Sequence, residues 1–493
     1  MQNRSLPLLP AIVFLVLSVL YVWIPATTCQ VMSSSATHDV YAGQSIQEAI
    51  NLAQPWDIIF VHNGTYYGGV EVNKTVSLVG ESRENTVIDN GGFHVDADNV
   101  TISGFTVKNG GGISFSGGQN LTISQNIIRN CTEGVNLYQV YDVMIENNII
   151  SSSGHVSGSI TFGGSGIWVW NCFNIIIEDN EVRDNIVEGI ATKLSGAVTI
   201  DRNVLANNSV GIRLTSAYYD TAHEVSFNTM SNHTSYGILL DQCYSGHVDI
   251  EGNTVADNEE GIYLKWSSGH TIYHNNFVNN TKSASVYMPD VYSSKWDSGY
   301  PSGGNYWSDY EGTDADHDGI GEASYTIDLN NTDQYPLTGI FQDFTVHSYP
   351  MGTQQPVEVV SNSTVTDLYL YMWMSSPYNG LEPGQPFLQF SATGEDGSVG
   401  FCRLMIPKTV LNGSTYIVLV DSNPINATLL PFSNSTHAYL YFTYGHSTHE
   451  VWVTIPEFSS ILVLSLLMIA TLFAIVVPKR KRFQHQTGRQ HMS

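Results

Sequence analysis

The residues best suited to bind a metal ion form an Asp-rich segment late in the chain. Carboxylates at alternate positions can converge on one hard cation, Gly319 permits a sharp turn, and a backbone carbonyl can add a ligand. An EF-hand would carry Glu at the twelfth position, where this chain has Tyr325. The segment therefore predicts a single-loop calcium site of structural role, and the alternative is an Asp/Gly turn without an ion. The predicted ligands are Asp314, Asp316, Asp318, the Ile320 carbonyl and Glu322.

Three acidic residues, Glu146, Glu178 and Asp201, recur at one phase of a repeated strand pattern. Stacked strands would place them outward on three consecutive rungs, where close like charges raise one another's pKa or recruit a cation. Carboxylate groups also act as acid and base in glycoside cleavage. The three residues are therefore candidate catalytic groups, and the alternative is a solvated outer face.

A second outward set combines aromatic, basic and amide side chains, which suit the apolar faces and hydroxyl rims of sugar rings. The Gly/Ser-rich insertion at residues 151–166 belongs to the repeat that carries both Trp residues, and it could form a wall or lid. The alternative is that the aromatic rings are covered by this same loop. The predicted glycan-binding residues are Asn136, Tyr138, Trp168, Trp170, Lys193, Arg213 and Tyr263.

Histidines form a third group of possible ligands. His247 and His270 begin adjacent rungs, with His223 and His274 nearby, and stacked imidazoles could bind a transition metal. No Met-rich run or close Cys/His pairing accompanies them. We therefore favour polar turn residues over a metal site.

The elements that must position these residues follow from a repeat of 22 to 32 residues. An aliphatic strand, an Asn and a Gly-aliphatic strand recur, which is typical of a solenoid whose equivalent residues stack about 4.8 Å apart. We expect the Asn residues to form a structural ladder at a bend. The Asn positions are Asn126, Asn148, Asn180, Asn203, Asn228, Asn253 and Asn276, and the Gly positions are Gly112, Gly134, Gly166, Gly189, Gly211, Gly237 and Gly261.

Residues 45–53 predict a short amphipathic helix, with Ser45 as its N-cap, that covers the open end of the stack. The sequence at 45–50, 63–66 and 76–80, then Gly-Gly-Asn-Tyr-Trp-Ser-Asp-Tyr at 303–310, the Asp-rich segment and Tyr-Pro-Leu at 335–337 resemble the NosD-type family of pectate-lyase-like β-helix proteins.

The resemblance covers about residues 38–340 and implies an all-β, right-handed, single-stranded parallel β-helix over 38–285 with an extension over 286–340. The family includes copper-site maturation proteins, carbohydrate-active enzymes and archaeal surface proteins. It therefore implies copper as one possible cofactor, without fixing an activity.

From residue 341 to 455 the repeat stops, and strand-like segments separated by turns predict a β-sandwich. The segment resembles the β-modules that precede the anchor in archaeal surface proteins, and we interpret it as a stalk. Pro456-Glu457-Phe458 is similar to archaeal Pro-Glu-Phe sorting signals, which implies a sorting peptidase as a partner.

Both ends of the chain predict membrane targeting. Residues 1–29 have the pattern of a secretory signal, 459–477 form an uncharged stretch long enough to span a bilayer, and 478–493 form a basic cytoplasmic tail. Thirteen Asn-x-Ser/Thr sequons predict glycosylation of the outer part. That part carries 13 basic against 45 acidic residues, which argues against nucleic acid as a partner.

These features favour a cell-surface protein, anchored by one membrane-spanning helix, that binds a polysaccharide or cell-surface glycan or supports the envelope without catalysis. The first alternative is a polysaccharide lyase or glycosidase that uses Glu146, Glu178 and Asp201, and we rank it second because no complete acid/base set is visible in the sequence. A NosD-like copper-binding protein is the second alternative.

Overall fold

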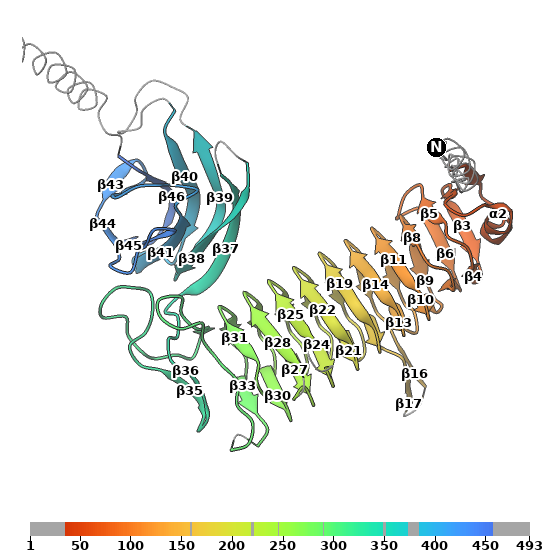
Figure 1. Ribbon diagram of the computed structural model, residues 1–493, viewed down its shortest axis with the longest axis horizontal. Coiled ribbons are helices and arrows are strands. Elements are labelled where there is room, and N and C mark those ends of the chain that lie inside the picture. The colour runs from red at the N-terminus through yellow and green to blue at the C-terminus, as the bar shows by residue number, and fades with distance from the viewer. Residues whose placement is uncertain are drawn as a thin grey trace, which may run out of the picture.

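The computed structural model describes residues 35–456 except 158–159, 218–220, 245, 289, 349–351 and 373–383. Figure 1 shows a long solenoid of short strands, with a second β-domain set at an angle to its C-terminal end. The chain begins its path at the far end of the solenoid and passes rung by rung toward the second domain.

Three parallel sheets form the walls of the solenoid, and each coil adds one strand to each sheet in turn. Sheet 1 contains β1 (Thr37–Val40), β2 (Ile58–Val61), β5 (Ser77–Gly80), β8 (Val100–Ser103), β11 (Gln119–Ser124), β14 (Tyr141–Glu146), β19 (Phe173–Glu178), β22 (Gly196–Asp201), β25 (Ala222–Ser226), β28 (His247–Glu251) and β31 (Thr271–Tyr273). Sheet 2 contains β3 (Gly64–Tyr67), β6 (Thr86–Asp89), β9 (Thr106–Lys108), β12 (Ile127–Arg129), β15 (Ile149–Ser151), β20 (Glu181–Arg183), β23 (Val204–Ala206), β26 (Thr229–Ser231), β29 (Thr254–Ala256), β32 (Asn276–Val278) and β34 (Tyr306–Trp307). Sheet 3 contains β4 (Val70–Val72), β7 (Gly92–Val95), β10 (Gly112–Ser116), β13 (Val135–Tyr138), β18 (Ile167–Trp170), β21 (Glu188–Lys193), β24 (Val210–Thr215), β27 (Tyr236–Asp241), β30 (Glu260–Lys265) and β33 (Lys282–Val286).

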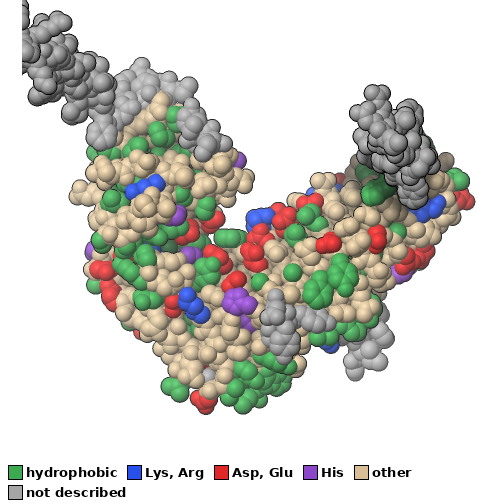
Figure 2. Space-filling view, in the orientation of Figure 1, with side chains coloured by type: hydrophobic (Ala, Val, Ile, Leu, Met, Phe, Trp, Pro, Cys, Tyr) green, Lys and Arg blue, Asp and Glu red, His purple; other side chains and the backbone are tan. Residues whose placement is uncertain are grey.

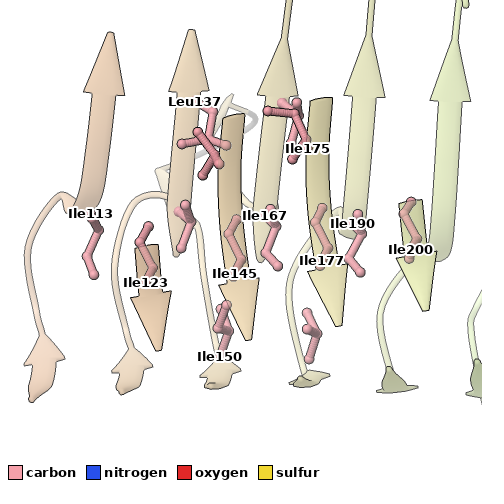
Figure 3. Packing of buried hydrophobic residues seen from close by; sticks show 14 of the residues in the cluster. Ile113, Ile123, Leu137, Ile145, Ile150, Ile167, Ile175, Ile177, Ile190 and Ile200 are labelled. Atoms are coloured by element: carbon pink, nitrogen blue, oxygen red, sulfur yellow. The ribbon is translucent and has the colours of Figure 1, made fainter. Parts of the chain in front are cut away.

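The core consists of columns of aliphatic side chains stacked along the solenoid axis. Ile123, Ile145, Ile177 and Ile200 occupy one register position of sheet 1 and are fully buried (Figure 3). Their strands alternate inward and outward residues, so the next side chain along each strand faces the surface. Burial of each such side chain contributes about 1.5–3 kcal/mol. The inward columns therefore fix which residues stand outside.

The predicted Asn ladder is present, with one correction. Asn126, Asn148, Asn180, Asn203, Asn228 and Asn253 are buried, and each side-chain amide donates to the side-chain oxygen of the next ladder residue at 2.9–3.1 Å. The next residue is Asn275, which then donates to Asn305 at 3.0 Å.

Asn276 does not belong to the ladder. Its amide oxygen accepts from the backbone N–H of Phe341, and its nitrogen donates to the Phe341 carbonyl, so it ties the solenoid to the following domain. The bend itself uses the residue before each ladder Asn: Asn147, Asp179 and Arg202 have φ between 52° and 56°. The left-handed conformation thus falls one residue earlier than the ladder Asn.

The recurrent Gly residues are required by close approach between rungs. A Cβ atom on Gly134 would lie 2.3 Å from the carbonyl oxygen of Gly166 and 2.4 Å from a methyl group of Ile150. Both distances are far below van der Waals contact. Side chains at this phase would push the rungs of sheet 3 apart.

Each end of the solenoid is covered. As predicted, Ser45 caps α2 (Ile46–Leu52) by accepting from the Glu48 N–H at 3.2 Å, and Ile46 and Ile50 are buried against the first coil. At the other end, Trp307 donates to Asp333 at 2.9 Å, and the extension adds a hairpin of β35 (Tyr325–Asp328) and β36 (Asn331–Asp333).

The insertion at residues 151–166 leaves the stack as an antiparallel hairpin, β16 (His155–Ser157) with β17 (Ile160–Phe162). Figure 1 shows it projecting from the solenoid beside β13. The extra residues therefore extend one loop without disturbing the register of β13 and β18.

The C-terminal domain is the predicted β-sandwich, built from two antiparallel five-stranded sheets. One contains β37 (Ile340–His347), β38 (Gln354–Ser361), β41 (Val399–Pro407), β45 (His437–Gly445) and β44 (Ala427–Leu429). The other contains β39 (Thr364–Met372), β40 (Pro386–Thr393), β46 (Thr448–Thr454), β42 (Ile417–Val420) and β43 (Asn423–Ile425). Their facing sides enclose a separate core that includes Leu388, Leu404 and Val453.

The predicted signal (1–29), membrane-spanning segment (459–477) and basic tail (478–493) lie outside the described residues. Across residues 35–456, as far as they are described, no helix is long and apolar enough to cross a membrane. Four cysteines of the described chain, at 131, 172, 243 and 402, are buried free thiols.

Candidate functional site

Sheet 3 brings part of the predicted glycan-binding set together. Tyr138, Trp170 and Lys193 occupy one outward register position on β13, β18 and β21. The Tyr138 and Trp170 ring centroids lie 5.0 Å apart, and Lys193 Nζ lies 5.8 Å from the centre of the Trp170 ring. Tyr138 and Trp170 remain 38% and 39% exposed. These three residues are called the aromatic platform below.

The next outward position on the same strands holds Asn136 and Trp168, which pair in register and are half-buried. They border the platform on the side toward the start of their strands. Tyr263 lies several rungs away and stacks on Tyr236 with centroids 5.3 Å apart. The structure therefore groups five of the predicted residues in or beside the platform and places Tyr263 at a separate point of the sheet.

Arg213 takes part in an ion-pair network rather than in an open face. Its guanidinium lies 3.2 Å from Glu188 and 3.0 Å from Asp241, and Lys265 lies 3.4 Å from the same Asp241 oxygen. Glu188 and Asp241 are 4% and 5% exposed. Two buried carboxylates need such partners, so the network has a structural role beside the platform.

A carboxylate pair on this face did not emerge from the sequence pattern. Glu133 and Glu188 lie on either side of Ser165 on successive rungs: the Ser165 N–H donates to Glu133 at 2.9 Å, and its hydroxyl donates to Glu188 at 2.8 Å. Burial, with a contribution from the Glu188 charge, raises the pKa of Glu133 to about 7. Its signal in the sequence was a polar residue directly before the repeat Gly on three successive rungs, at Glu133, Ser165 and Glu188.

The predicted acidic column stands as expected on sheet 1. Glu146 pairs in register with Glu178, and Glu178 with Asp201. Arg202, in the left-handed position after Asp201, reaches back to Glu178 at 3.1 Å and also bonds Asp201. Burial raises the pKa of Asp201 and Arg202 opposes this rise. An arginine shared by two of the three carboxylates favours an ion-pair role over acid and base roles.

The same column continues beyond Asp201 to Ser226, Glu251 and Tyr273. There it reaches the sandwich, where a cleft of about 670 Å³ separates the two domains. Figure 2 shows acidic side chains on both sides of this angle. The cleft is lined by Arg202, Phe227, Thr229, Gly252 and Thr254 of the solenoid and by Phe341, Gln342, Asp343, Phe344, Thr345, Gln354, Gln355 and Pro356 of the sandwich.

In the Asp-rich loop, three of the predicted ligands converge. One carboxylate oxygen each from Asp314, Asp316 and Glu322 lies within 4.8 Å of the others. Asp318 instead accepts from the Ile320 N–H at 2.9 Å, and Ile320 is buried in a bridge to Leu337. The loop can therefore offer three carboxylates to a cation, with Asp318 closing the turn.

A second group with metal-ligand spacing lies at the start of sheet 3. Glu71, His94 and Asp96 are exposed, with ligand atoms within 4.8 Å of one another. His94 Nδ1 bonds the Ser114 hydroxyl at 2.9 Å, which orients Nε2 toward Asp96 at 3.3 Å. No feature of the repeat pattern had singled out these residues.

The four histidines do not form a copper site as they stand. His223 and His270 point into the core, His247 is exposed and bonds Asp249, and His274 stacks on Phe341. Burial lowers the pKa of His223 and His274 to about 4. Within the described part of the chain, none of the four joins a group of three ligand atoms within 4.8 Å. No step of function is therefore assigned to copper.

Comparison with known proteins agrees with this fold. A family model described as "Periplasmic copper-binding protein (NosD)" matches residues 151–312, and one described as "Right handed beta helix region" matches residues 68–221. The probable ABC transporter binding protein NosD of Pseudomonas aeruginosa is 32% identical over 130 residues, which cover 25% of this chain and 29% of the relative. The chain thus spans less than a third of that relative's length. These matches support a NosD-like right-handed β-helix.

Solved structures with a similar shape include a mannuronan C-5 epimerase module and an alginate lyase. The A-module of mannuronan C-5 epimerase AlgE4 from Azotobacter vinelandii is 14% identical, with a TM-score of 0.43, and the alignment covers 51% of this chain and 81% of the module. An alginate lyase from Paenibacillus sp. is 16% identical, with a TM-score of 0.34, and the alignment covers 55% and 97% of the two chains. At these levels the likeness carries no argument about activity.

Proposed function

We propose that the protein is a glycan-binding β-helix displayed outside the membrane, with the aromatic platform as its binding face. The observation that carries this proposal is the exposed Tyr138–Trp170 pair with Lys193 beside it. Rings of this kind are amphipathic and cover the apolar face of a pyranose, while Lys193 and the half-buried Asn136 can bond its hydroxyls. The signal, membrane segment, Pro-Glu-Phe motif and sorting peptidase remain predictions of the same proposal.

Spacing along the solenoid supports a polymer rather than a single sugar. Successive rungs stand about 4.8 Å apart, so the platform residues form a short row along the axis. Hairpin β16–β17 leaves the solenoid from the loop before β18. A chain lying along the solenoid would therefore contact two or three rungs at once.

The test is binding of a glycan array and calorimetry on the full chain with Trp170→Ala and Tyr138→Ala. Each ring is expected to contribute about 0.5–1.5 kcal/mol, so each substitution should raise Kd about 2- to 10-fold. Tyr67→Ala is the matched control, because Tyr67 is 80% exposed on sheet 2, away from the platform. Equal losses for Tyr67→Ala and Trp170→Ala would remove the platform from the proposal.

Glycan cleavage is the second candidate, favoured by one observation. Glu133, whose pKa lies near 7, and Glu188, paired with Arg213, differ in environment in the way acid and base partners do. Reducing-sugar and unsaturated-product assays on bound glycans, with and without calcium, test this candidate. Turnover lost in Glu133→Gln would support this pair, and turnover lost only in Glu178→Gln would assign it to the acidic column instead.

A further inference from the structure

Three carboxylates face one another where the solenoid meets the sandwich. Asp343 of β37 and Glu358 of β38 are directly opposite in the antiparallel pair. Like charges in this position destabilise a sheet. Glu251, at the end of the acidic column on β28, adds a third negative charge that acts on both. The hairpin that docks onto the solenoid therefore carries a repulsion that its own partners do not remove.

Buried polar atoms around these carboxylates have no hydrogen-bond partner. His274, which is 2% exposed, directs Nδ1 toward Glu251 Oε1 at 3.9 Å, and this nitrogen is unpaired. Asp343 Oδ1 is likewise buried and unpaired, as is Nη1 of Arg403, which is 3% exposed. A buried polar atom without a hydrogen-bond partner costs free energy. A change in protonation or in the position of the joint would relieve this cost.

Two further acids, Glu224 and Asp249, and two arginines, Arg202 and Arg403, surround the three carboxylates. On the solenoid side, Tyr273 donates its hydroxyl to Glu251 at 2.5 Å. On the sandwich side, Arg403 partly offsets the charge of Glu358 while its own guanidinium bonds the Pro301 carbonyl. The titratable and charged groups that face the three carboxylates are Glu224 of β25, Asp249 of β28, Tyr273 of β31, His274 after it, Arg202 at the cleft, Arg403 of β41 and Tyr439 of β45.

We propose that the joint between solenoid and sandwich is a proton-sensitive switch, which is closed while Glu251, Asp343 and Glu358 hold protons and loosens when they ionise. Asn276, which bonds the Phe341 backbone from the solenoid side, and the Arg403–Pro301 contact act as the fixed tethers of this joint. The cleft of about 670 Å³ lies between the same elements, so its width would follow the state of the joint.

The direction of the pH effect follows from the environment of the three groups. Burial and the neighbouring carboxylates raise the pKa of Glu358 to about 8 and that of Asp343 to about 6, and they also raise the pKa of Glu251. Acids whose pKa is raised by docking stabilise the docked form at low pH, and this contribution is lost as pH rises through the raised values. Only the part of this rise that comes from contact with the solenoid, including the charge of Glu251, acts on docking, so docking should weaken by at least about 10-fold between about pH 6 and pH 9. His274 stays neutral over this range, because burial lowers its pKa to about 4.

Hydrogen–deuterium exchange of the full chain, followed by mass spectrometry, measures this change. Peptides that contain β31 and β37 report on the joint, and a peptide from β45, inside the sandwich core, corrects for the intrinsic effect of pH. In the wild-type chain the joint peptides should lose at least about ten times more protection than β45 when the pH is raised from about 6 to 9.

The double variant Asp343→Asn/Glu358→Gln should lose no more protection than β45, because its amides cannot ionise. Glu251→Gln alone should remove part of the effect and serves as the second variant if the double variant does not fold. Glu146→Gln is the matched control, because Glu146 lies in the same column but four rungs from Glu251. This variant should behave as wild type. Equal changes in joint and β45 peptides of the wild type, or a wild-type response in the double variant, would overturn the proposal.

Discussion

Asn180→Ala should strongly destabilise the solenoid, because a single ladder amide serves several buried groups. Asn180 donates to Asn203, to the Ile145 carbonyl and to the Glu178 carbonyl, all at 2.9–3.0 Å. Its side-chain oxygen accepts from both the backbone N–H and the side-chain amide of Asn148, each at 3.0 Å.

The magnitude follows from the groups left unpaired. The substitution removes five hydrogen bonds and leaves two donors of Asn148 without an acceptor, at about 1–3 kcal/mol for each buried group. The expected loss in the free energy of unfolding is therefore about 4 kcal/mol. Chemical unfolding in urea, followed by circular dichroism on the full chain, measures it as a lower midpoint at unchanged slope.

The matched control is Asn85→Ala. Asn85 is exposed, and its side-chain amide donates to the Ser82 hydroxyl at the surface, so its removal should change stability by less than about 0.5 kcal/mol. A loss below about 1 kcal/mol for Asn180→Ala, with the slope unchanged, would refute the view that the ladder stabilises the coils.

Three further outcomes are expected. Calcium should bind the full chain with a Kd of about 0.1–1 mM, measured by calorimetry. This binding should weaken in Asp316→Asn and Glu322→Gln and persist in Asp318→Asn, because the Asp318 carboxylate closes the turn. Equal loss of binding in all three variants would contradict the ligand assignment. Gly134→Ala should lower the thermal midpoint, since its Cβ has no space beside Gly166, whereas Gly117→Ala, with nothing within 4 Å but a φ of 69°, should cost less. His449 and Asp421 form an ion pair at 2.7 Å, which raises the pKa of His449 and lowers that of Asp421. A double-mutant cycle should measure a coupling energy of under about 1 kcal/mol at about pH 5.5, where His449 is charged. The coupling should vanish at about pH 9, where His449 is neutral.

The repeat predicted the coils because inward positions tolerate few residue types. Its one error of phase came at Asn275-Asn276, where two adjacent residues fit the pattern equally well. Packing decides between them: counting from Asn275 places Ile272 and Phe277, both fully buried, at the inward positions. Counted from Asn275, His274 falls at the left-handed bend, with a φ of 57°, and its burial comes from the ring of Phe341 in the sandwich, which stacks on it.

The repeat predicts which residues lie in register, but it does not predict which partners their side chains contact. The register of Glu178 and Asp201 followed from the repeat, but the pairing of both with Arg202 depends on a left-handed bend that turns a long side chain back across one rung. The Glu133–Ser165–Glu188 arrangement depends in the same way on a serine brought into register by an insertion. Asp343 and Glu358 are far from Glu251 in the sequence, so only the docking of the two domains brings these charges together.

The alternation of inward and outward side chains along each strand of the solenoid also indicates which outward residues have a function. Because buried residues form the ladder and the aliphatic columns, outward side chains that have no ion-pair role contribute little to folding. An outward aromatic pair that stays more than one third exposed leaves apolar surface in water without stabilising the coil. Glu178, Asp201 and Arg213 each have an ion-pair partner that accounts for their position, whereas Tyr138 and Trp170 contact mainly each other and Lys193. In the proposed function, a ligand that covers both rings would remove this apolar surface from water.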